Sequence, residues 1–326
     1  MLKGKKILFS PLDWGLGHAT RSVPLIRQLQ KDNTIILGVT ALTKLIFDEE
    51  FPELKQVELP SYQIEYSNVL PLWLKLGLDS PRITGVIISE HNALDKIIDE
   101  HKIDTIISDN RFGLYNKKTH NIFVTHQVFL KSPIFNLAAQ TINRNYILKF
   151  DELWIPDFEK LWESLSGELS HGEHYHKSVK YIGPLSRLKD ADSPTLQKNY
   201  DVLILLSGPE PLRTELETSL TAKLKNSEKK IALVRGTKSG TISDSLNWDV
   251  FDLPEKEKLK GLILGSKKII CRSGYSTLMD LHALEKKDLV LVPTPGQTEQ
   301  EYLAKYWEEK FGVKNIPQNK ITTFVI

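Results

Sequence analysis

The sequence has 326 residues, too many for one ordinary hydrophobic core, and this length predicts two domains of about 150 residues each. Hydrophobic residues make up 40% and charged residues 26% of the chain, which is typical of a globular protein and not of a disordered or fibrous one. The formal charge is only +2, which argues against nucleic acid as a partner. The single cysteine, Cys271, excludes an intrachain disulfide and a zinc ribbon, and it fits a reducing cytoplasm. No stretch reaches the roughly 20 apolar residues of a membrane span, so any membrane contact is expected to be peripheral.

Short apolar runs alternate with helical patterns along the whole chain. In chain order the runs are KKILFS, TIILGVT, DTIISD, NIFVTH, ELWIPD, VKYIG, DVLILLSG, KIALVRG, WDVFDL, KIICRSG and DLVLVP. Nearly continuous apolar runs are typical of parallel strands that helices cover on both faces. Apolar residues three or four positions apart predict helices at 19–31, 84–101, 133–149, 211–225, 255–265, 276–286 and 298–310. We therefore predict an α/β fold with two doubly wound, Rossmann-like domains.

A polar segment at 183–199 contains two prolines and no sustained period, and it is predicted to link the two domains. We place the boundary near Pro184, which gives domains at 1–184 and 185–326. Ligands of open parallel sheets bind beyond the carboxyl ends of the strands. We therefore expect the strand-end loops of the two domains to face each other across a cleft.

The first strand-end loop reads DWGLGHATRS, and in it Gly15 and Gly17 allow a tight turn and the close approach of a ligand. It is not a dinucleotide cradle, because Thr20 replaces the third glycine of the GxGxxG fingerprint and the second strand ends without an acidic residue. His18 falls at the start of a helix, where the helix dipole favours the neutral imidazole. It either acts as a general base or only lines the turn, and Arg21 either binds an anionic group or is a solvated surface residue.

Three other stretches of the first domain and the linker have two possible interpretations each. The apolar stretch at 68–78 could dock a lipid-linked substrate or a membrane surface, but we favour a partly buried core segment. The clustered His171, His174 and His176 suggest a metal site, but without cysteine or suitably spaced carboxylate ligands we favour a loop. The D-x-D sequence at 190–192 lies in the predicted linker, and we interpret it as solvated charge.

The strand KIIC of the second domain runs into a loop that places Arg272, Ser273 and Gly274 directly before a helix. The N–H groups and the dipole at such a helix start form an anion site that suits a diphosphate. Asp280 either completes a capping box with Thr277 as N-cap or accepts the two hydroxyls of a ribose.

Three further strand-end loops of the second domain are rich in small and hydrogen-bonding residues. Glu299 and Gln300, at the start of the last helix, either bind sugar hydroxyls or complement the helix dipole. The loops after DVLILL and KIALV add Ser207, Gly208, Arg235 and Gly236. Together the four loops predict one large nucleotide pocket.

The motifs GLGHATRS and CRSGYSTLMD…VPTPGQTEQEY resemble those of family 28 glycosyltransferases of the GT-B class, a family that includes the N-acetylglucosaminyltransferase that makes lipid II for peptidoglycan. The order and spacing of the elements agree with this resemblance over nearly the whole chain. The resemblance implies a hexosyltransferase whose second domain holds a nucleotide sugar, commonly UDP-linked, as co-substrate and no other cofactor. It places Ser273 and Gly274 near the diphosphate. It also places Asp280 on the ribose and Gln300 on the donor sugar.

By the same resemblance the first domain would hold a glycan or lipid-linked acceptor, with His18 near the reacting centre. We hypothesise an inverting transfer in which His18, or a nearby carboxylate, removes the proton of the acceptor hydroxyl while the oxygen attacks the anomeric carbon. The helix start after Gly274, together with Arg272, would stabilise the leaving diphosphate without a metal. The residues expected on the acceptor side, unless they serve only loop hydrogen bonding, are Gly15, Gly17, Arg21, Asp109, Asn110 and His126.

The sequence departs from the family pattern in two places. GLG replaces three adjacent glycines and QTEQE replaces a more basic stretch, so the identity of the acceptor does not follow from the resemblance. The sequence also leaves little room after residue 311 for the helix that in this fold usually crosses back to the first domain. One alternative function is a nucleotide-sugar hydrolase, because hydrolases of related fold carry a similar GxGHxxR loop, and another is a non-enzymatic nucleotide-sugar sensor. We expect a cytoplasmic protein of cell-envelope synthesis, at the inner face of the membrane.

Overall fold

The computed structural model describes residues 2–62, 79–131, 136–192, 199–237 and 247–324, which form two compact units. The described residues up to Ser186 belong to the first unit, and those from Arg187 onward belong to the second. This division lies close to Pro184, where the sequence predicts the domain boundary. The apolar stretch at 68–78, for which we predicted a core or lipid-docking role, lies outside the described residues.

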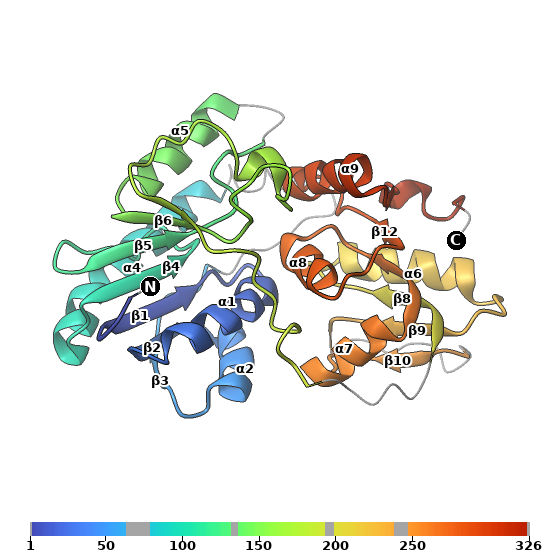
Figure 1. Ribbon diagram of the computed structural model, residues 1–326, viewed down its shortest axis with the longest axis horizontal. Coiled ribbons are helices and arrows are strands. Elements are labelled where there is room, and N and C mark those ends of the chain that lie inside the picture. Colours follow the sequence, from blue (N-terminus) through green and yellow to red (C-terminus); the bar gives the residue numbers. More distant parts are fainter. Residues whose placement is uncertain (1, 63–78, 132–135, 193–198, 238–246, 325–326) are drawn as a thin grey trace. The chain divides into compact units, whose positions relative to one another are not determined.

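The described part of the first unit contains a seven-stranded parallel sheet in the order β3-β2-β1-β4-β5-β6-β7. Its strands, drawn from blue to yellow-green in Figure 1, are β1 Lys6–Pro11, β2 Thr34–Val39, β3 Lys55–Glu58, β4 Thr105–Asp109, β5 His120–Val124, β6 Glu152–Ile155 and β7 Val179–Tyr181. Its helices are α1 Leu16–Leu29, α2 Ala41–Glu50, α4 Ser80–His101 and α5 Asn136–Ile147, and a 3-10 turn covers Gly167–Leu169.

The strand order explains how helices come to cover both faces of this sheet. The chain moves outward from β1 to β3 and then returns to β4, so right-handed crossovers place α4 on the face opposite to α1 and α2. Leu8, Ile36 and Ile106 of the sheet pack against Leu94 and Ile98 of α4, and all five are buried. The apolar runs are therefore strands buried on both faces, as predicted.

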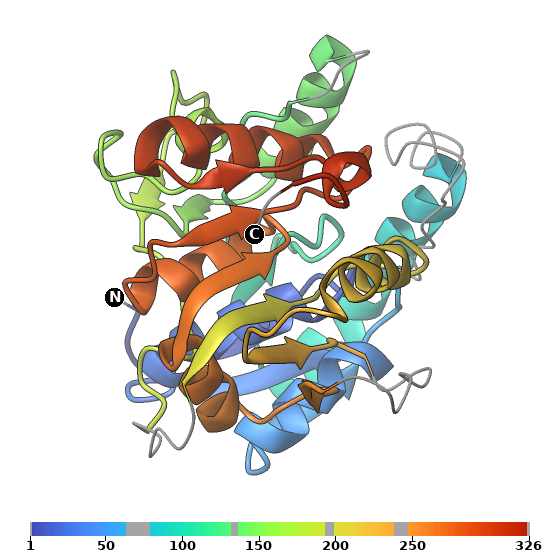
Figure 2. The same ribbon diagram turned by 90° about the vertical axis from the view of Figure 1, so that its right-hand side faces the viewer.

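The described part of the second unit contains a six-stranded parallel sheet in the order β10-β9-β8-β11-β12-β13. Figure 2 shows its central strands side by side, from yellow (β8) to orange (β11 and β12). The strands are β8 Tyr200–Leu205, β9 Ile231–Val234, β10 Asp249–Phe251, β11 Ser266–Cys271, β12 Leu289–Leu291 and β13 Lys314–Asn315. The helices are α6 Leu212–Leu224, α7 Lys256–Leu264, α8 Tyr275–Ala283 and α9 Thr298–Phe311, followed by a 3-10 turn at Gln318–Lys320.

The core of the second unit lies between its sheet and α6. Leu216 and Leu220 of α6 pack against Ile204 of β8 and Ile270 of β11, and Ile321 near the end of the chain joins the same cluster. Because the last residues fill this core, the turn after β13 belongs to the second unit. The prediction of an α/β fold with two Rossmann-like domains is confirmed.

The helix bounds differ from the prediction in ways that have local causes. Helix α1 begins at Leu16 and not at residue 19, because Gly15 takes φ +141° and makes the turn directly before the helix. Helix α2 was not predicted, although the Thr43 hydroxyl in its first turn accepts the N–H of Thr40 at 2.9 Å. The short strands β3 and β13 were also not predicted.

None of the helices in the described part of the chain is long and apolar enough to span a bilayer.

Candidate functional site

Polar side chains of the first unit gather where its central strands end. In the parallel register Pro11 of β1 lies beside Asp109 of β4, and Asp109 lies beside Val124 of β5. The loops after these three strands therefore leave the sheet at one edge. They carry His18, Asp109 and His126, which the sequence predicts on the acceptor side or at the reacting centre.

Asp109 joins most of these side chains. Its carboxylate is buried and accepts a two-pronged interaction from Arg21, with Nε 2.9 Å from Oδ2 and Nη2 close to Oδ1. The Ser22 hydroxyl donates to the carbonyl of His18 at 2.8 Å and lies 3.3 Å from Oδ2. His18 approaches from the same helix, with Nδ1 3.1 Å from Oδ1. One carboxylate thus fixes three side chains of the first two turns of α1.

The electrostatics of this cluster keep His18 neutral. Burial lowers the pKa of His18 below its usual 6.5, and the Arg21 guanidinium lowers it further. Burial alone would raise the pKa of Asp109, but Arg21 and His18 hold it well below its usual range, so the carboxylate stays ionised. An ionised carboxylate accepts the Nδ1 proton of His18, which leaves the Nε2 lone pair free to take another proton. The His18 side chain is 19% exposed, so it can be reached from solvent.

The other predicted acceptor-side residues lie around this cluster. Arg21 is only 3% exposed and donates from Nη1 to Nδ1 of the buried His126 at 3.3 Å, so the interpretation as a solvated surface arginine is wrong. Asn110 takes a left-handed φ of +64° directly after β4. Gly15 has open space around it, and Gly17 accepts a hydrogen bond from the Thr20 hydroxyl at 3.1 Å. Their roles toward an acceptor stay a prediction.

A buried ion pair that the sequence analysis missed contacts the start of the first strand-end loop, DWGLGHATRS. The side chain of Arg111 is fully buried, and its Nε is 2.6 Å from Oε1 of the equally buried Glu90. Tyr62 donates its hydroxyl to Oε2 of Glu90 at 2.8 Å. Arg111 also donates to the carbonyl of Pro11 at 3.3 Å, and Asp13 accepts the N–H of Tyr62. The pair therefore holds the start of this loop against α4. The one signal for the pair in the sequence was the position of Glu90 on an apolar face of a predicted helix.

In the second unit the ends of β9, β8, β11 and β12 are neighbours, and each runs into one of the predicted loops. Gly208 and Gly236 have φ of +104° and +71°. A Cβ on Gly236 would lie 2.5 Å from the carbonyl oxygen of Leu206, so only glycine fits between these two loops.

Helix α8 begins at Tyr275 with Gly274 as its N-cap, so the positive end of its dipole lies at the end of β11, as the diphosphate prediction requires. Thr277 lies inside the helix and Asp280 lies in the second turn. The interpretation of these two residues as a capping box is therefore wrong, because the helix starts before Thr277. The ribose role of Asp280 stays a prediction.

Arg272 is a buried cation directly before this helix start. It is 1% exposed and donates to the carbonyls of Leu212 at 2.7 Å, Val292 at 3.1 Å and Pro293 at 3.2 Å. Its Nε has no hydrogen-bond partner, and no carboxylate of the described chain lies within ion-pair distance. Burial lowers its pKa to about 10, so it is charged at neutral pH. Among the described residues it forms no direct ion pair, and the nearby Glu215 carboxylate only partly offsets the effect of burial.

Arg235, in contrast, has its charge neutralised. Its Nε is 2.9 Å from Oε1 of Glu217 and its Nη1 is 3.0 Å from Oδ1 of Asp252. Arg213 binds the other oxygen of Glu217. Arg235 therefore holds α6 to the end of β9, and Arg272 is the better placed of the two to attract a diphosphate.

Ser273 and Gln300 are brought together by the fold. The Ser273 hydroxyl donates to the carbonyl of Gln300 at 2.7 Å, which ties the loop after β11 to α9. The side chain of Gln300 accepts the N–H of Thr294 at 2.9 Å and donates to Gln297 at 2.5 Å. Glu299 is partly exposed in the first turn of α9, and Ser207 is partly exposed after β8.

The three histidines near residue 174 do not share a site. The Ser170 hydroxyl lies 2.7 Å from Nδ1 of His171, the hydroxyl of Tyr181 lies 2.9 Å from Nε2 of His174, and His176 faces backbone carbonyls. No group of three or more His, Cys, Asp or Glu side chains among the described residues could hold a metal ion. Asp190 and Asp192 are exposed, in agreement with their interpretation as solvated charge.

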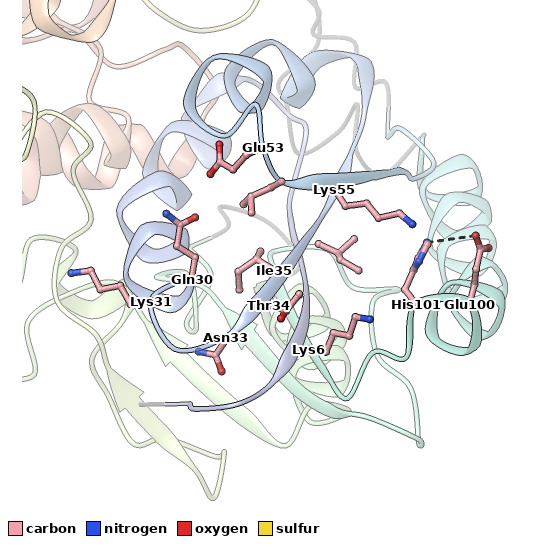
Figure 3. Close-up of a pocket in the computed structure, with 12 residues that line it drawn as sticks. Lys6, Gln30, Lys31, Asn33, Thr34, Ile35, Glu53, Lys55, Glu100 and His101 are labelled. Carbon is pink, nitrogen blue, oxygen red and sulfur yellow. Dashed lines mark ion pairs between the residues drawn. The ribbon is translucent and has the colours of Figure 1, made fainter.

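A hollow of about 810 Å³ lies at the opposite end of the first sheet (Figure 3). Lys6, Thr34 and Lys55 on its wall are the first residues of β1, β2 and β3, and His101 comes from the end of α4. Because ligands of parallel sheets bind at the carboxyl ends of the strands, this hollow is not the candidate site.

Two α/β units with parallel sheets, and with polar loops at the carboxyl ends of their central strands, are the architecture of the GT-B fold. Solved structures that share this fold include the following three. Acinetobacter baumannii MurG has 15% identity and a TM-score of 0.56, with 98% of this chain and 87% of that chain covered. Arabidopsis thaliana UGT89C1, complexed with UDP-L-rhamnose, has 14% identity and a TM-score of 0.63 over 98% and 87%. The calicheamicin glycosyltransferase CalG4 has 12% identity and a TM-score of 0.65 over 98% and 87%.

Residues 216–326 match the glycosyltransferase family 28 C-terminal domain, while no curated protein matches the chain. The second unit therefore carries a family 28 domain. The predicted resemblance to family 28 glycosyltransferases and the prediction of a glycosyltransferase enzyme are confirmed.

Proposed function

We propose that this glycosyltransferase moves a hexose from a UDP-linked donor to a hydroxyl of a glycan or lipid-linked acceptor, with inversion and without a metal ion. The observation that carries the proposal is the contact of His18 with the buried, ionised Asp109. It provides a neutral imidazole of fixed orientation with one nitrogen free, which is what a general base needs.

In the proposed reaction Nε2 of His18 removes the proton of the acceptor hydroxyl. The hydroxyl oxygen forms a bond to the anomeric carbon while the bond from that carbon to the phosphate oxygen breaks, and the leaving UDP takes the electron pair. Asp109 stabilises the imidazolium that forms, and Arg21 keeps Asp109 ionised throughout. The proton then leaves His18 to solvent.

The second unit would hold the donor. The N–H groups at the start of α8 and the unpaired charge of Arg272 offer positive potential to a diphosphate, so no metal is needed to stabilise the leaving group. Two of the solved structures of this fold have nucleoside diphosphates in their titles, UDP-L-rhamnose for UGT89C1 and thymidine diphosphate for the spinosyn rhamnosyltransferase SpnG. We assign Asp280 to the ribose and Gln300 to the donor sugar, with Glu299 beside it. The remaining wall of the pocket is assigned to Ser207, Gly208, Arg235, Gly236, Ser273 and Gly274.

We place this activity in the cytoplasm, at the inner face of the membrane. Helix α5 supports the membrane contact, because Leu137 is 83% exposed and Ile142 is 60% exposed. The helix contains Arg144 and no acidic residue, which suits a surface of anionic lipids.

The test is turnover of a panel of nucleotide sugars with candidate lipid and glycan acceptors, by the wild-type protein and by His18→Ala. We expect UDP-sugars to be used in the presence of EDTA, and we expect His18→Ala to lower kcat at least about 100-fold. Unchanged turnover by His18→Ala would remove the general-base assignment. Release of free sugar without acceptor at the rate of the best transfer would instead establish hydrolysis, and tight binding without any turnover would establish a sensor.

A further inference from the structure

The hydroxyl of Thr294 is a buried group without a hydrogen-bond partner, at the same edge of the second sheet as Arg272. Thr294 is fully buried and follows β12, which is the strand beside β11. Its backbone is fixed, because its N–H donates to Oε1 of Gln300 at 2.9 Å and its carbonyl accepts the N–H of Gln297 at 3.1 Å. Oγ1 alone has nothing to bond to. A buried hydroxyl in this state costs free energy, which a ligand that bonds to it would recover.

The hydroxyl faces the loop after β8. A Cβ built on Gly208 would lie 3.8 Å from Oγ1 of Thr294, and it would meet no other atom within 4 Å. Since β8 and β12 lie on either side of β11, the line from Thr294 to Gly208 crosses the strand end where Arg272 and the start of α8 lie. The unpartnered hydroxyl, the buried cation and the helix N-terminus therefore lie at the ends of two neighbouring strands, at one edge of the sheet.

We propose that Thr294 is a binding residue for the donor, and that its hydroxyl donates a hydrogen bond to a phosphate oxygen of the nucleoside diphosphate. This inference rests on the proposed function of the second unit and adds to it Thr294, which lies inside the VPTPGQTEQEY motif but was given no role by the sequence analysis. A phosphate is the ligand that this site favours, because Thr294 Oγ1 can donate to it, Arg272 supplies positive charge, and the start of α8 contributes the positive end of the helix dipole.

The same geometry explains why glycine stands at position 208. Gly208 lies beside the hydroxyl, since a Cβ at this position would be 3.8 Å from Oγ1 of Thr294. Gly208 is exposed, and apart from the Thr294 hydroxyl there is free space beside it. A side chain at this position would fill the space that the phosphate needs.

The experiment compares Thr294→Val, which replaces the hydroxyl by a methyl group of the same shape, with Thr294→Ser, which keeps the hydroxyl. Calorimetric titration with UDP should show affinity reduced at least about tenfold in Thr294→Val and within about threefold of wild type in Thr294→Ser, since a hydrogen bond to a charged group has this strength. Uridine, which has no phosphate, should bind both variants like the wild type. Without ligand, Thr294→Val should unfold at the wild-type midpoint or above it, because the lost hydroxyl has no partner.

Thr105→Val is the matched control, because Thr105 is also fully buried but its hydroxyl donates to Asp104 at 2.7 Å, in the other unit. This variant should lower the unfolding midpoint and leave UDP affinity unchanged. Wild-type UDP affinity in Thr294→Val would overturn the inference and leave the proposed function standing. A loss of stability in Thr294→Val as large as that of the control would have the same two consequences. Failure of the wild-type protein to bind UDP or any other nucleoside diphosphate would overturn both.

Discussion

His18 and Asp109 lie 91 positions apart in the sequence and meet because β1 and β4 are neighbours in the sheet. The sequence placed both residues at strand ends but could not pair them, since the pairing depends on the strand order. It also left Arg21 undecided, because nothing in the local pattern shows that this side chain turns inward to a carboxylate. Thr294 was missed for the same reason: an unsatisfied hydroxyl is visible only once its neighbours are in place.

The lowered pKa of His18 predicts how activity depends on pH. The imidazole must be neutral to act as a base, so kcat/KM should be constant above about pH 6.5 and fall tenfold per pH unit below the pKa of His18, which burial places below 6.5. Asp109, with a pKa well below its usual range, should not contribute to this fall. A pH–rate profile measured from pH 4.5 to 8 checks the prediction. An acidic limb that begins above pH 7 would contradict it.

At the scale of elements, the glycine loops of the second unit differ in how strictly they need glycine. Gly236→Ala should lower the free energy of unfolding by about 1–3 kcal/mol, because the new Cβ would lie 2.5 Å from the Leu206 carbonyl in a left-handed backbone. Gly274→Ala is the control, since a Cβ there meets nothing within 4 Å and φ is −68°. Urea denaturation measures both. Equal stabilities of the two variants would show that the loops move apart easily.

Helix α5 gives a second prediction at this scale. The double variant Leu137→Asp, Ile142→Asp should bind vesicles that contain phosphatidylglycerol at least about tenfold less than the wild type, because each exposed apolar side chain gains about 1.5–3 kcal/mol when it enters the bilayer. Leu253→Asp, at a residue 42% exposed in the second unit, is the matched control and should bind like the wild type. Vesicle co-sedimentation provides the measurement. Wild-type binding by the double variant would exclude α5 as the membrane surface.

The predicted helices and strands differ in how well the sequence pattern indicated them. Every strand predicted from an apolar run is present, and the central strands among them are buried on both faces, which leaves such a run few alternatives. The edge strands β3 and β13 were missed because their residues are only partly buried and carry no apolar run. The capping box proposed at Thr277 failed because Gly274 can end the loop and begin α8 without a side-chain cap.

At the scale of the whole molecule, the two units should respond differently to nucleotide. UDP at about 100 times its Kd should stabilise the second unit by about 2.7 kcal/mol, through binding to its folded state alone. Hydrogen exchange followed by mass spectrometry should show slower exchange in the loops around 207–208 and 272–274. Exchange around Asp157, whose carboxylate organises the turn at 164–170 of the first unit, should stay unchanged. Protection confined to the first unit would reverse the assignment of the donor domain.

The unpaired charge of Arg272 also affects what happens after the reaction. On the proposed function, the groups that bind the diphosphate of the donor also bind the diphosphate of the product UDP. The transferred sugar takes no part in these contacts, so its departure does not weaken them. Release of UDP would take an anion away from this buried cation, so the product should dissociate slowly and compete strongly with fresh donor. Turnover should therefore begin with a burst and then slow, and a phosphatase that removes UDP from solution should restore the initial rate.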